Sequence, residues 1–204
     1  MTSDVTDAAI AEIIAAGRFL AARGWVPATS GNFSRRINAD AAAITVTGAD
    51  KGELTPDQVT TISLREPLPP GVSAETPVHV ALYRSAPDVG AVLHTHSVAA
   101  TVVSLAHRGK TAIMLEGYEL VKGMRGYQSH EETLHLPLFE NTQDMETLAV
   151  AVDSRLTPGA GCRGFILAGH GLYAWGASMR EARRHTEALE FMLACELERG
   201  RYRP

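Results

Sequence analysis

The sequence alternates between segments of strand character and segments of helical character. Residues 91–96 have the composition of a buried strand, and residues 98–106 then have helical character. Further strands are predicted at 111–115 and 134–139, a helix at 144–156, and two strand halves within 164–175. Helices placed between strands indicate an α/β layering, in which helices cover the faces of a sheet. The pattern alone does not give the strand order.

Both ends of the chain carry helix signals. Apolar residues at helical spacing predict a helix over 7–23, which Gly24 terminates. The last helix begins with a capping box, in which Glu181 follows Ser178 by three residues. The other predicted elements are strands at 32–37 and 43–47, a helix from Thr76 that ends before Pro87, and a surface loop at 158–161.

Length and composition favour one globular domain spanning residues 1–204. The net charge is −4 and no basic block is present, so we expect no nucleic-acid partner. No run of about 18 apolar residues and no secretory signal occur, so we expect no membrane association and a cytoplasmic protein. Only two cysteines, Cys162 and Cys195, are present, which fits a reducing compartment.

The most informative polar motif is His94-Thr95-His96. Side chains at i and i+2 of a strand project from the same face, about 7 Å apart at their Cα atoms, so both imidazoles can approach one ion. A catalytic zinc takes three protein ligands and keeps one open position. His170 lies between two glycines, which permit close backbone approach or a positive φ, and is the natural third ligand. An isolated His-x-His is more often a surface or packed pair, but the Gly-His-Gly sequence favours a metal site.

The other histidines are expected to have structural roles. His185 lies on the predicted buried face of the last helix, where a hydrogen-bonded core histidine is the usual finding. The remaining four have no partner at ligand spacing: His79, His107, His130 and His135.

Two carboxylates and three short segments are further candidates for a site. Glu75 precedes the helix cap at Thr76, and Glu119 lies in a short segment that ends at Gly123. The segments 29–32, 47–51 and 73–74 are rich in small hydrogen-bonding residues, and each is compatible with an ordinary turn. Together they can also supply backbone N–H groups, hydroxyls and one lysine to an anion such as a phosphate monoester.

These segments, in this order, resemble the zinc-dependent class II aldolase and adducin-head family. The match covers nearly the whole chain and rests on Gly31-Asn32, Thr47-Gly48, Ser73-x-Glu75, the helix carrying residues 79–84, residues 91–96 and Gly169-His170-Gly171. The resemblance implies a three-layer α/β fold with a central, mainly antiparallel β-sheet flanked by helices. It also implies a homotetramer with active sites near the subunit boundaries, acting on a small phosphorylated ketose.

The resemblance also assigns roles to individual residues. One Zn²⁺ per subunit would be held by His94, His96 and His170. The phosphate-binding roles fall on Gly31, Asn32, Thr47, Gly48 and Ser73, to which Lys51 is added on charge alone. Glu75 matches the acidic position beside the metal in the aldolases, and Glu119 matches the catalytic acid/base of the family's dehydratases.

Three functions within this family are considered. Segments 119–123 and 140–142 resemble the dehydratases, which remove water from a phosphorylated ketose. An aldolase or epimerase would share the zinc and phosphate sites, but Glu119 and the absence of a clear match to the aldolases' C-terminal tyrosine argue against it; Ala74 also replaces a serine of the aldolases. A non-catalytic adducin-like binding module needs no metal, and the presence of all three histidines argues against it.

Overall fold

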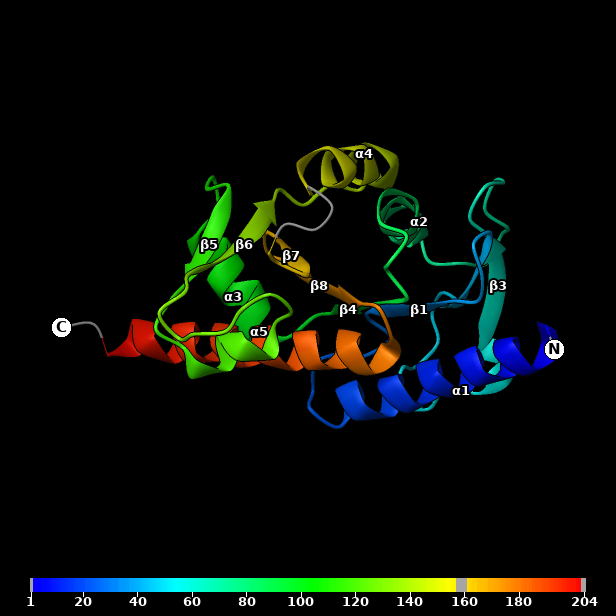
Figure 1. The fold of residues 1–204 in the computed structure, drawn as a ribbon, viewed down its shortest axis with the longest axis horizontal. Coiled ribbons are helices and arrows are strands. Elements are labelled where there is room, and N and C mark those ends of the chain that lie inside the picture. The colour runs from blue at the N-terminus through cyan, green and yellow to red at the C-terminus, as the bar shows by residue number, and fades with distance from the viewer. Residues whose placement is uncertain (1, 157–160, 203–204) are drawn as a thin grey trace.

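An eight-stranded sheet runs through the middle of the molecule, which the computed structural model describes over residues 2–156 and 161–202 (Figure 1). The strand order is β3-β2-β1-β4-β8-β7-β6-β5, and all neighbours are antiparallel except β6 and β7. The strands are β1 (Asn32–Arg36), β2 (Ala41–Thr45), β3 (Val59–Ser63), β4 (Ala91–Thr95), β5 (Ala112–Leu115), β6 (Leu134–Phe139), β7 (Gly164–Leu167) and β8 (Gly171–Gly176). The predicted mainly antiparallel sheet is confirmed.

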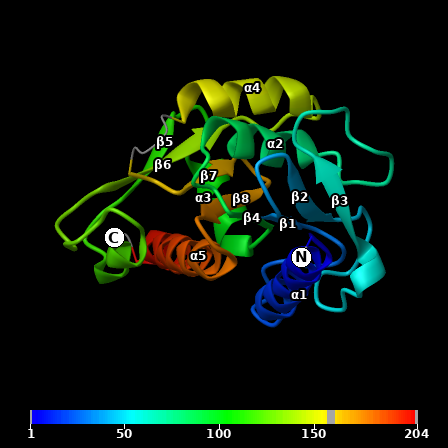
Figure 2. The same ribbon diagram turned by 45° about the vertical axis from the view of Figure 1, so that its right-hand side comes forward.

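Helices cover both faces of the sheet, which confirms the predicted three layers. The helices are α1 (Thr2–Ala21), α2 (Thr76–Ser85), α3 (Val98–Ala106), α4 (Met145–Arg155) and α5 (Met179–Arg201), with short 3₁₀ turns η1 (Pro56–Gln58) and η2 (Glu119–Gly123). Figures 1 and 2 show α2 and α4 above the sheet and α1 and α5 below it. Core residues of α3 pack with those of α5, so α3 belongs to the same side.

Strand β4 contributes side chains to the hydrophobic cores on both faces of the sheet. Successive side chains of a strand point to opposite faces. Val92 packs in the core that contains α2 and α4, whereas Ala91 and Leu93 pack in the core that contains α1. Continued along the strand, this alternation places His94 on the α2 face and Thr95 on the α5 face.

Helix α1 begins earlier than the sequence predicts. It starts at Thr2 instead of residue 7 and ends at Ala21 instead of residue 23. The prediction started where the apolar spacing starts, but the first turn of a surface helix needs no apolar residue. Asp4 in that first turn is favourable near the helix N-terminus.

The strands in the N-terminal half also differ from the prediction. β2 comprises Ala41–Thr45 instead of 43–47, because its first residues pair with β3 although alanine has low strand propensity. Val46 forms only an isolated bridge, and Thr47 lies outside the strand. β3 itself was not predicted. The predicted loop at 158–161 lies, except for Gly161, outside the described residues.

The remaining predicted elements are confirmed to within one or two residues at each end. Among the described residues, none of the helices combines the length and the apolar character that a membrane span requires.

Candidate active site

Four side chains from separate parts of the chain converge where the central strands β4 and β7 end and β8 begins. His94 is the second-last residue of β4, His96 follows that strand, His170 lies in the turn between β7 and β8, and Glu75 occupies the N-cap position of α2. The nearest ligand atoms of all four lie within 4.8 Å of one another. Glu75 approaches His170 Nε2 at 3.0 Å and His94 Nε2 at 3.4 Å. The three histidines singled out from the sequence and the neighbouring carboxylate are therefore brought together.

The two glycines around His170 are required by the backbone. Gly169 has a φ of +68°, which side chains disfavour, and turns the chain at the end of β7. At Gly171 an added Cβ would lie 2.0 Å from the carbonyl oxygen of Thr95, so only glycine lets β8 approach β4 here. From α3, Ser104 Oγ accepts the Gly169 N–H at 2.9 Å. The turn that carries His170 is thus fixed on several sides.

In both His94 and His170, a hydrogen bond made by Nδ1 leaves Nε2 as the nitrogen that faces the cluster. His94 Nδ1 donates to the Leu172 carbonyl at 3.0 Å, and His170 Nδ1 donates to Asn141 Oδ1 at 3.1 Å. Both Nε2 atoms therefore carry lone pairs, yet they face each other at 3.3 Å and also face the oxygens of Glu75. Acceptors that converge in this way are brought into favourable contact by a cation between them. Imidazole nitrogens and a carboxylate oxygen are the donor set of a divalent transition metal such as zinc.

The ionisation states of the cluster suit metal binding. Burial raises the pKa of Glu75, but the surrounding His94 and His170 outweigh it, so the pKa lies well below its ordinary value. Burial, reinforced by the same two histidines, lowers the pKa of His96 to about 3. At neutral pH Glu75 is therefore ionised and His96 neutral, which are the forms that bind a metal.

An open cavity of about 340 Å³ adjoins the cluster. Glu75, His96 and His170 line one part of it. The same cavity is lined by all six residues predicted to bind phosphate: Gly31, Asn32, Thr47, Gly48, Lys51 and Ser73. Three loops distant in sequence therefore meet beside the metal ligands.

Two of the cavity's polar groups retain hydrogen-bonding capacity. The Ser30 hydroxyl is buried and has no hydrogen-bond partner among the described residues. Lys51 is 1% exposed, and its ammonium group donates to the carbonyls of Thr29 at 3.0 Å and Ala49 at 2.5 Å, which leaves one of its three N–H groups. Burial lowers the pKa of Lys51, while Asp50 and Glu75 oppose that shift.

The Asn32 amide is engaged within the protein. Its Nδ2 donates to Glu75 at 2.5 Å and to Ser73 Oγ at 3.3 Å, and its Oδ1 lies 2.6 Å from His79 Nε2. The amide group is thus bound to the metal side of the cavity, and the predicted role of Asn32 in phosphate binding stays a prediction.

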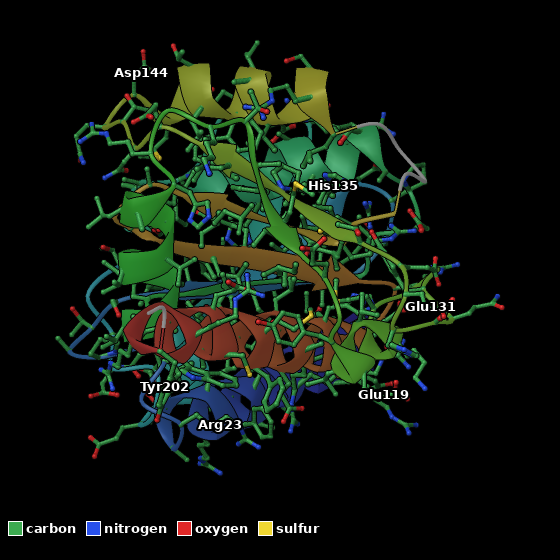
Figure 3. The ribbon with its side chains drawn as sticks, turned by 90° about the vertical axis from the view of Figure 1, so that its left-hand side faces the viewer. Arg23, Glu119, Glu131, His135, Asp144 and Tyr202 are labelled. Atoms are coloured by element: carbon green, nitrogen blue, oxygen red, sulfur yellow. The ribbon has the colours of Figure 1, made fainter. Side chains whose placement is uncertain are left out.

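Glu119 lies apart from the cluster. It begins η2 beside α5, its side chain is 68% exposed, and it forms an ion pair with Lys122. Figure 3 shows it at the outer rim of the molecule. It does not line the cavity. Its hydrogen bond with Lys122 lowers its pKa, so it is ionised at neutral pH. Its predicted catalytic role is therefore not supported by proximity within one chain.

Two residues near the cluster were not assigned a role from the sequence. Asn141 orients His170, and it lies in the 140–142 segment used above only for the resemblance. The ring of Tyr173 stacks on that of His94 at 4.0 Å, as expected for directly opposite residues of β8 and β4.

Glu190 on α5 forms hydrogen bonds on the opposite face of β4, the strand that carries His94. Its carboxylate is 1% exposed and accepts hydrogen bonds from Thr95 and Ser97, each at 2.5 Å. Burial raises its pKa to about 7, although both hydroxyls oppose this shift. One feature of the sequence could have indicated this buried carboxyl: Glu190 follows Leu189, which lies on the predicted apolar face of the last helix.

Comparison with known proteins agrees with this fold. The Class II Aldolase and Adducin N-terminal domain matches residues 11–197, and the chain belongs to this family. The chain is 49% identical to the methylthioribulose-1-phosphate dehydratase of Parvibaculum lavamentivorans over 185 residues, which cover 91% of each protein. It is 48% identical to the protein of that name from Hahella chejuensis over 190 residues, covering 92% of this chain and 91% of the relative.

A solved structure gives the same fold. The L-fuculose-1-phosphate aldolase from Thermus thermophilus superposes with a TM-score of 0.78 at 26% identity, covering 99% of this chain and 98% of that protein.

Proposed function

We propose that this protein is a methylthioribulose-1-phosphate dehydratase that uses a divalent metal ion. The observation that carries the proposal is the group of converging acceptors, three imidazoles and one carboxylate, at the edge of a cavity lined by small-residue loops. The dehydratases that are about 49% identical over nine-tenths of the chain support the choice of reaction. The reaction removes water from 5-methylthioribulose 1-phosphate and gives 2,3-diketo-5-methylthiopentyl 1-phosphate, a step of methionine salvage.

The proposed metal is zinc, one ion per subunit. His94, His96 and His170 would hold it, with Glu75 as a neighbouring carboxylate. When bound, a divalent cation acts as a Lewis acid on the C2 carbonyl of the ketose, which makes the C3 hydrogen acidic. The chemistry of the donor set fits this ion, because nitrogen and oxygen ligands of this kind are typical of zinc.

The small-residue loops would bind the phosphate group of the substrate. The Lys51 ammonium contributes a positive charge, and Ser30 contributes a hydroxyl that has no partner among the described residues. Gly31, Thr47, Gly48 and Ser73 surround the same cavity. Anchoring the phosphate there orients C2, C3 and C4 relative to the cluster, which accelerates the reaction by proximity.

The carboxylates would transfer the protons. Elimination breaks the C3–H bond and the C4–O bond, so a base must accept the C3 proton and an acid must protonate the departing hydroxyl. We assign the acid step to Glu119. Because its carboxylate is ionised in the isolated chain, it must first take up a proton, from C3 if Glu119 is also the base or from solvent if Glu75 is the base. The base step falls to Glu75, which lies inside the cavity, or to Glu119 itself.

A role for Glu119 requires a second subunit, and we propose a homotetramer in which it reaches a neighbour's cavity. The surface near Glu119 has apolar side chains typical of a subunit contact. Leu120 on η2 is 40% exposed, Phe191 on α5 is 52% exposed, and Val98 at the start of α3 is 71% exposed. The cytoplasmic location expected from the sequence stays a prediction.

A substrate comparison tests the proposed function. The metal-loaded protein is offered methylthioribulose 1-phosphate, fuculose 1-phosphate and ribulose 5-phosphate in parallel, and the products of each are identified. We expect turnover of the first compound to the diketone. Cleavage of fuculose 1-phosphate would instead identify an aldolase, and epimerisation of ribulose 5-phosphate would identify an epimerase. A protein that binds no metal and turns over none of the three would fit the adducin-like binding module.

A further inference from the structure

A chain of hydrogen bonds leads from the metal cluster into the core. Asn32 donates to Glu75 at 2.5 Å and contacts His79 Nε2 at 2.6 Å. On its other side, His79 Nδ1 contacts Ser34 Oγ at 2.7 Å, and Ser34 Oγ contacts the Tyr83 hydroxyl at 2.8 Å. Two residues of β1 and one of α2 thus connect the carboxylate to Tyr83, which lies further along α2.

The hydrogen-bonded residues beyond Glu75 are buried. Ser34 and His79 have no exposed surface, and Asn32 and Tyr83 are each 2% exposed. Water therefore cannot replace a lost partner, and each donor must meet an acceptor within the chain. Such a buried network is stable only when all of its members are satisfied.

The direction of every hydrogen bond follows from the Asn32 amide, whose Nδ2 donates to Glu75. An ionised carboxylate only accepts, so the NH₂ group of Asn32 faces it and Oδ1 faces His79. The carbonyl oxygen Oδ1 also only accepts, so His79 carries its proton on Nε2. Burial lowers the pKa of His79 to about 3, so the ring is neutral and its Nδ1 accepts from Ser34. The hydroxyl oxygen of Ser34 then accepts from Tyr83.

From this arrangement we infer that His79 is a positioning residue for the metal site: it holds the Asn32 amide with its N–H group toward Glu75. The inference rests on the metal site proposed above. With the opposite tautomer, the Asn32 amide would turn its oxygen toward the carboxylate, and two acceptors would repel each other. Glu75 would then move away from His94 and His170. Asn32 acts here on the carboxylate, a role different from the predicted contact with phosphate.

Removing the imidazole tests the inference, with His185 as a matched control. His185 is also fully buried, and its ring also makes two hydrogen bonds, to the carbonyl of Trp175 and from the N–H of Arg125. Both His79→Leu and His185→Leu should reduce folding stability. Zinc is titrated into chelator-treated protein. His79 acts through Asn32 on Glu75, whose carboxylate faces the ion, so we expect about 10–100-fold weaker zinc binding for His79→Leu, the range typical of lost hydrogen-bonded support around a metal site, and less than about threefold weaker binding for His185→Leu.

Two milder variants separate the orientation of Asn32 from the loss of the ring. His79→Gln retains an N–H donor at the position of Nε2 and should bind zinc within about threefold of wild type. Ser34→Ala removes the donor to Nδ1 together with the acceptor of the Tyr83 hydroxyl, so the ring can take the other tautomer, and zinc binding should weaken by about tenfold. These two variants also decide the question if His79→Leu does not fold. Unchanged zinc binding in Ser34→Ala, or equal weakening in His79→Gln and His79→Leu, would overturn the inference.

The tautomer of His79 can be observed directly by ¹⁵N NMR of the wild-type protein. We expect the proton on Nε2, and a proton on Nδ1 would contradict the inference. A wild-type protein that binds zinc and dehydrates its substrate, while His79→Leu and His185→Leu bind zinc equally, would remove only this inference. A wild-type protein that neither binds zinc nor dehydrates the substrate would contradict the proposed function. The tautomer of His79 would then still decide whether the hydrogen bonds from Glu75 to Tyr83 have the directions described.

Discussion

At the scale of single residues, the site is defined by acceptor atoms that face one another with no hydrogen-bond donor of the described residues between them. The hydrogen bonds of His94 to Leu172 and of His170 to Asn141 turn both Nε2 atoms toward Glu75. No sequence pattern contains this information, because Leu172 and Asn141 are placed there by the sheet and by a loop. The convergence of these histidines was predictable from His-x-His and Gly-His-Gly, and the orientation of their rings was not.

Lys51 gives the prediction that belongs to this scale. Lys51→Met retains the length of the buried side chain and removes the charge near the proposed phosphate position. Because this contact is equally strong in the bound substrate and in the transition state, KM should rise and kcat should change little. A charge-assisted hydrogen bond contributes about 1.5–3 kcal/mol, so KM should increase by roughly 10–100-fold.

Steady-state kinetics with the phosphorylated ketose measures this effect. Competitive inhibition by inorganic phosphate should weaken in parallel, which separates loss of the anion contact from general disturbance of the loop. An unchanged KM would exclude Lys51 from the site.

At the scale of secondary-structure elements, the sequence predicts best the elements whose periodicity is local. The strands 91–96 and 134–139 and the helix 144–156 were predicted almost to their ends because the apolar residues and end signals of each lie within the segment itself. β3 was missed although its β-branched residues favour a strand, because its two apolar residues, Val59 and Ile62, do not alternate, and its pairing with β2 is a contact that the sequence does not show. The role of Glu190 could not be predicted either, because Thr95 and Ser97, its two partners, are about 95 residues away in sequence.

Glu190 on α5 gives a pH-dependent prediction. Its pKa is about 7 in the folded protein, compared with 4.5 for the ordinary group. The folded state therefore binds the proton more tightly than the unfolded state, and this contribution to stability is present below pH 4.5 and is lost as the pH rises toward 7. Glu190→Gln does not ionise. Its free energy of unfolding relative to wild type should therefore increase between pH 5 and pH 8, by about 2 kcal/mol.

Urea denaturation at both pH values measures this difference. Glu187→Gln, on the same helix but with a half-exposed side chain paired with Arg23, is the control for the loss of one carboxylate. A pH dependence equal to that of the control would show that Glu190 is not the group responsible.

At the scale of the whole molecule, one chain brings together the proposed metal ligands and the cavity but does not bring Glu119 to them. The resemblance to the family predicted Glu119 as a catalytic residue, but no feature of a single chain shows where it acts. Its exposed position on η2, beside exposed apolar side chains, fits a role across a subunit boundary.

Glu119→Gln tests this role. The variant cannot transfer a proton, so kcat should fall by about 10²–10⁴-fold, whereas zinc content and KM should change little. Mixed tetramers give the more specific result. Glu119→Gln and His94→Ala subunits, each inactive alone, should regain activity after joint refolding if the two residues act in one site from different chains. Activity that is not regained would place Glu119 outside the neighbour's site, and wild-type turnover in Glu119→Gln would assign the acid/base steps to Glu75.

The central claim is that this chain dehydrates its substrate and does not cleave it. The most direct measurement is the NMR spectrum of the products formed from methylthioribulose 1-phosphate by protein of known metal content. We predict about one metal ion per chain and a single phosphorylated product, the diketone that differs from the substrate by one water molecule. Two carbon fragments, or turnover by protein whose metal has been removed, would contradict the account.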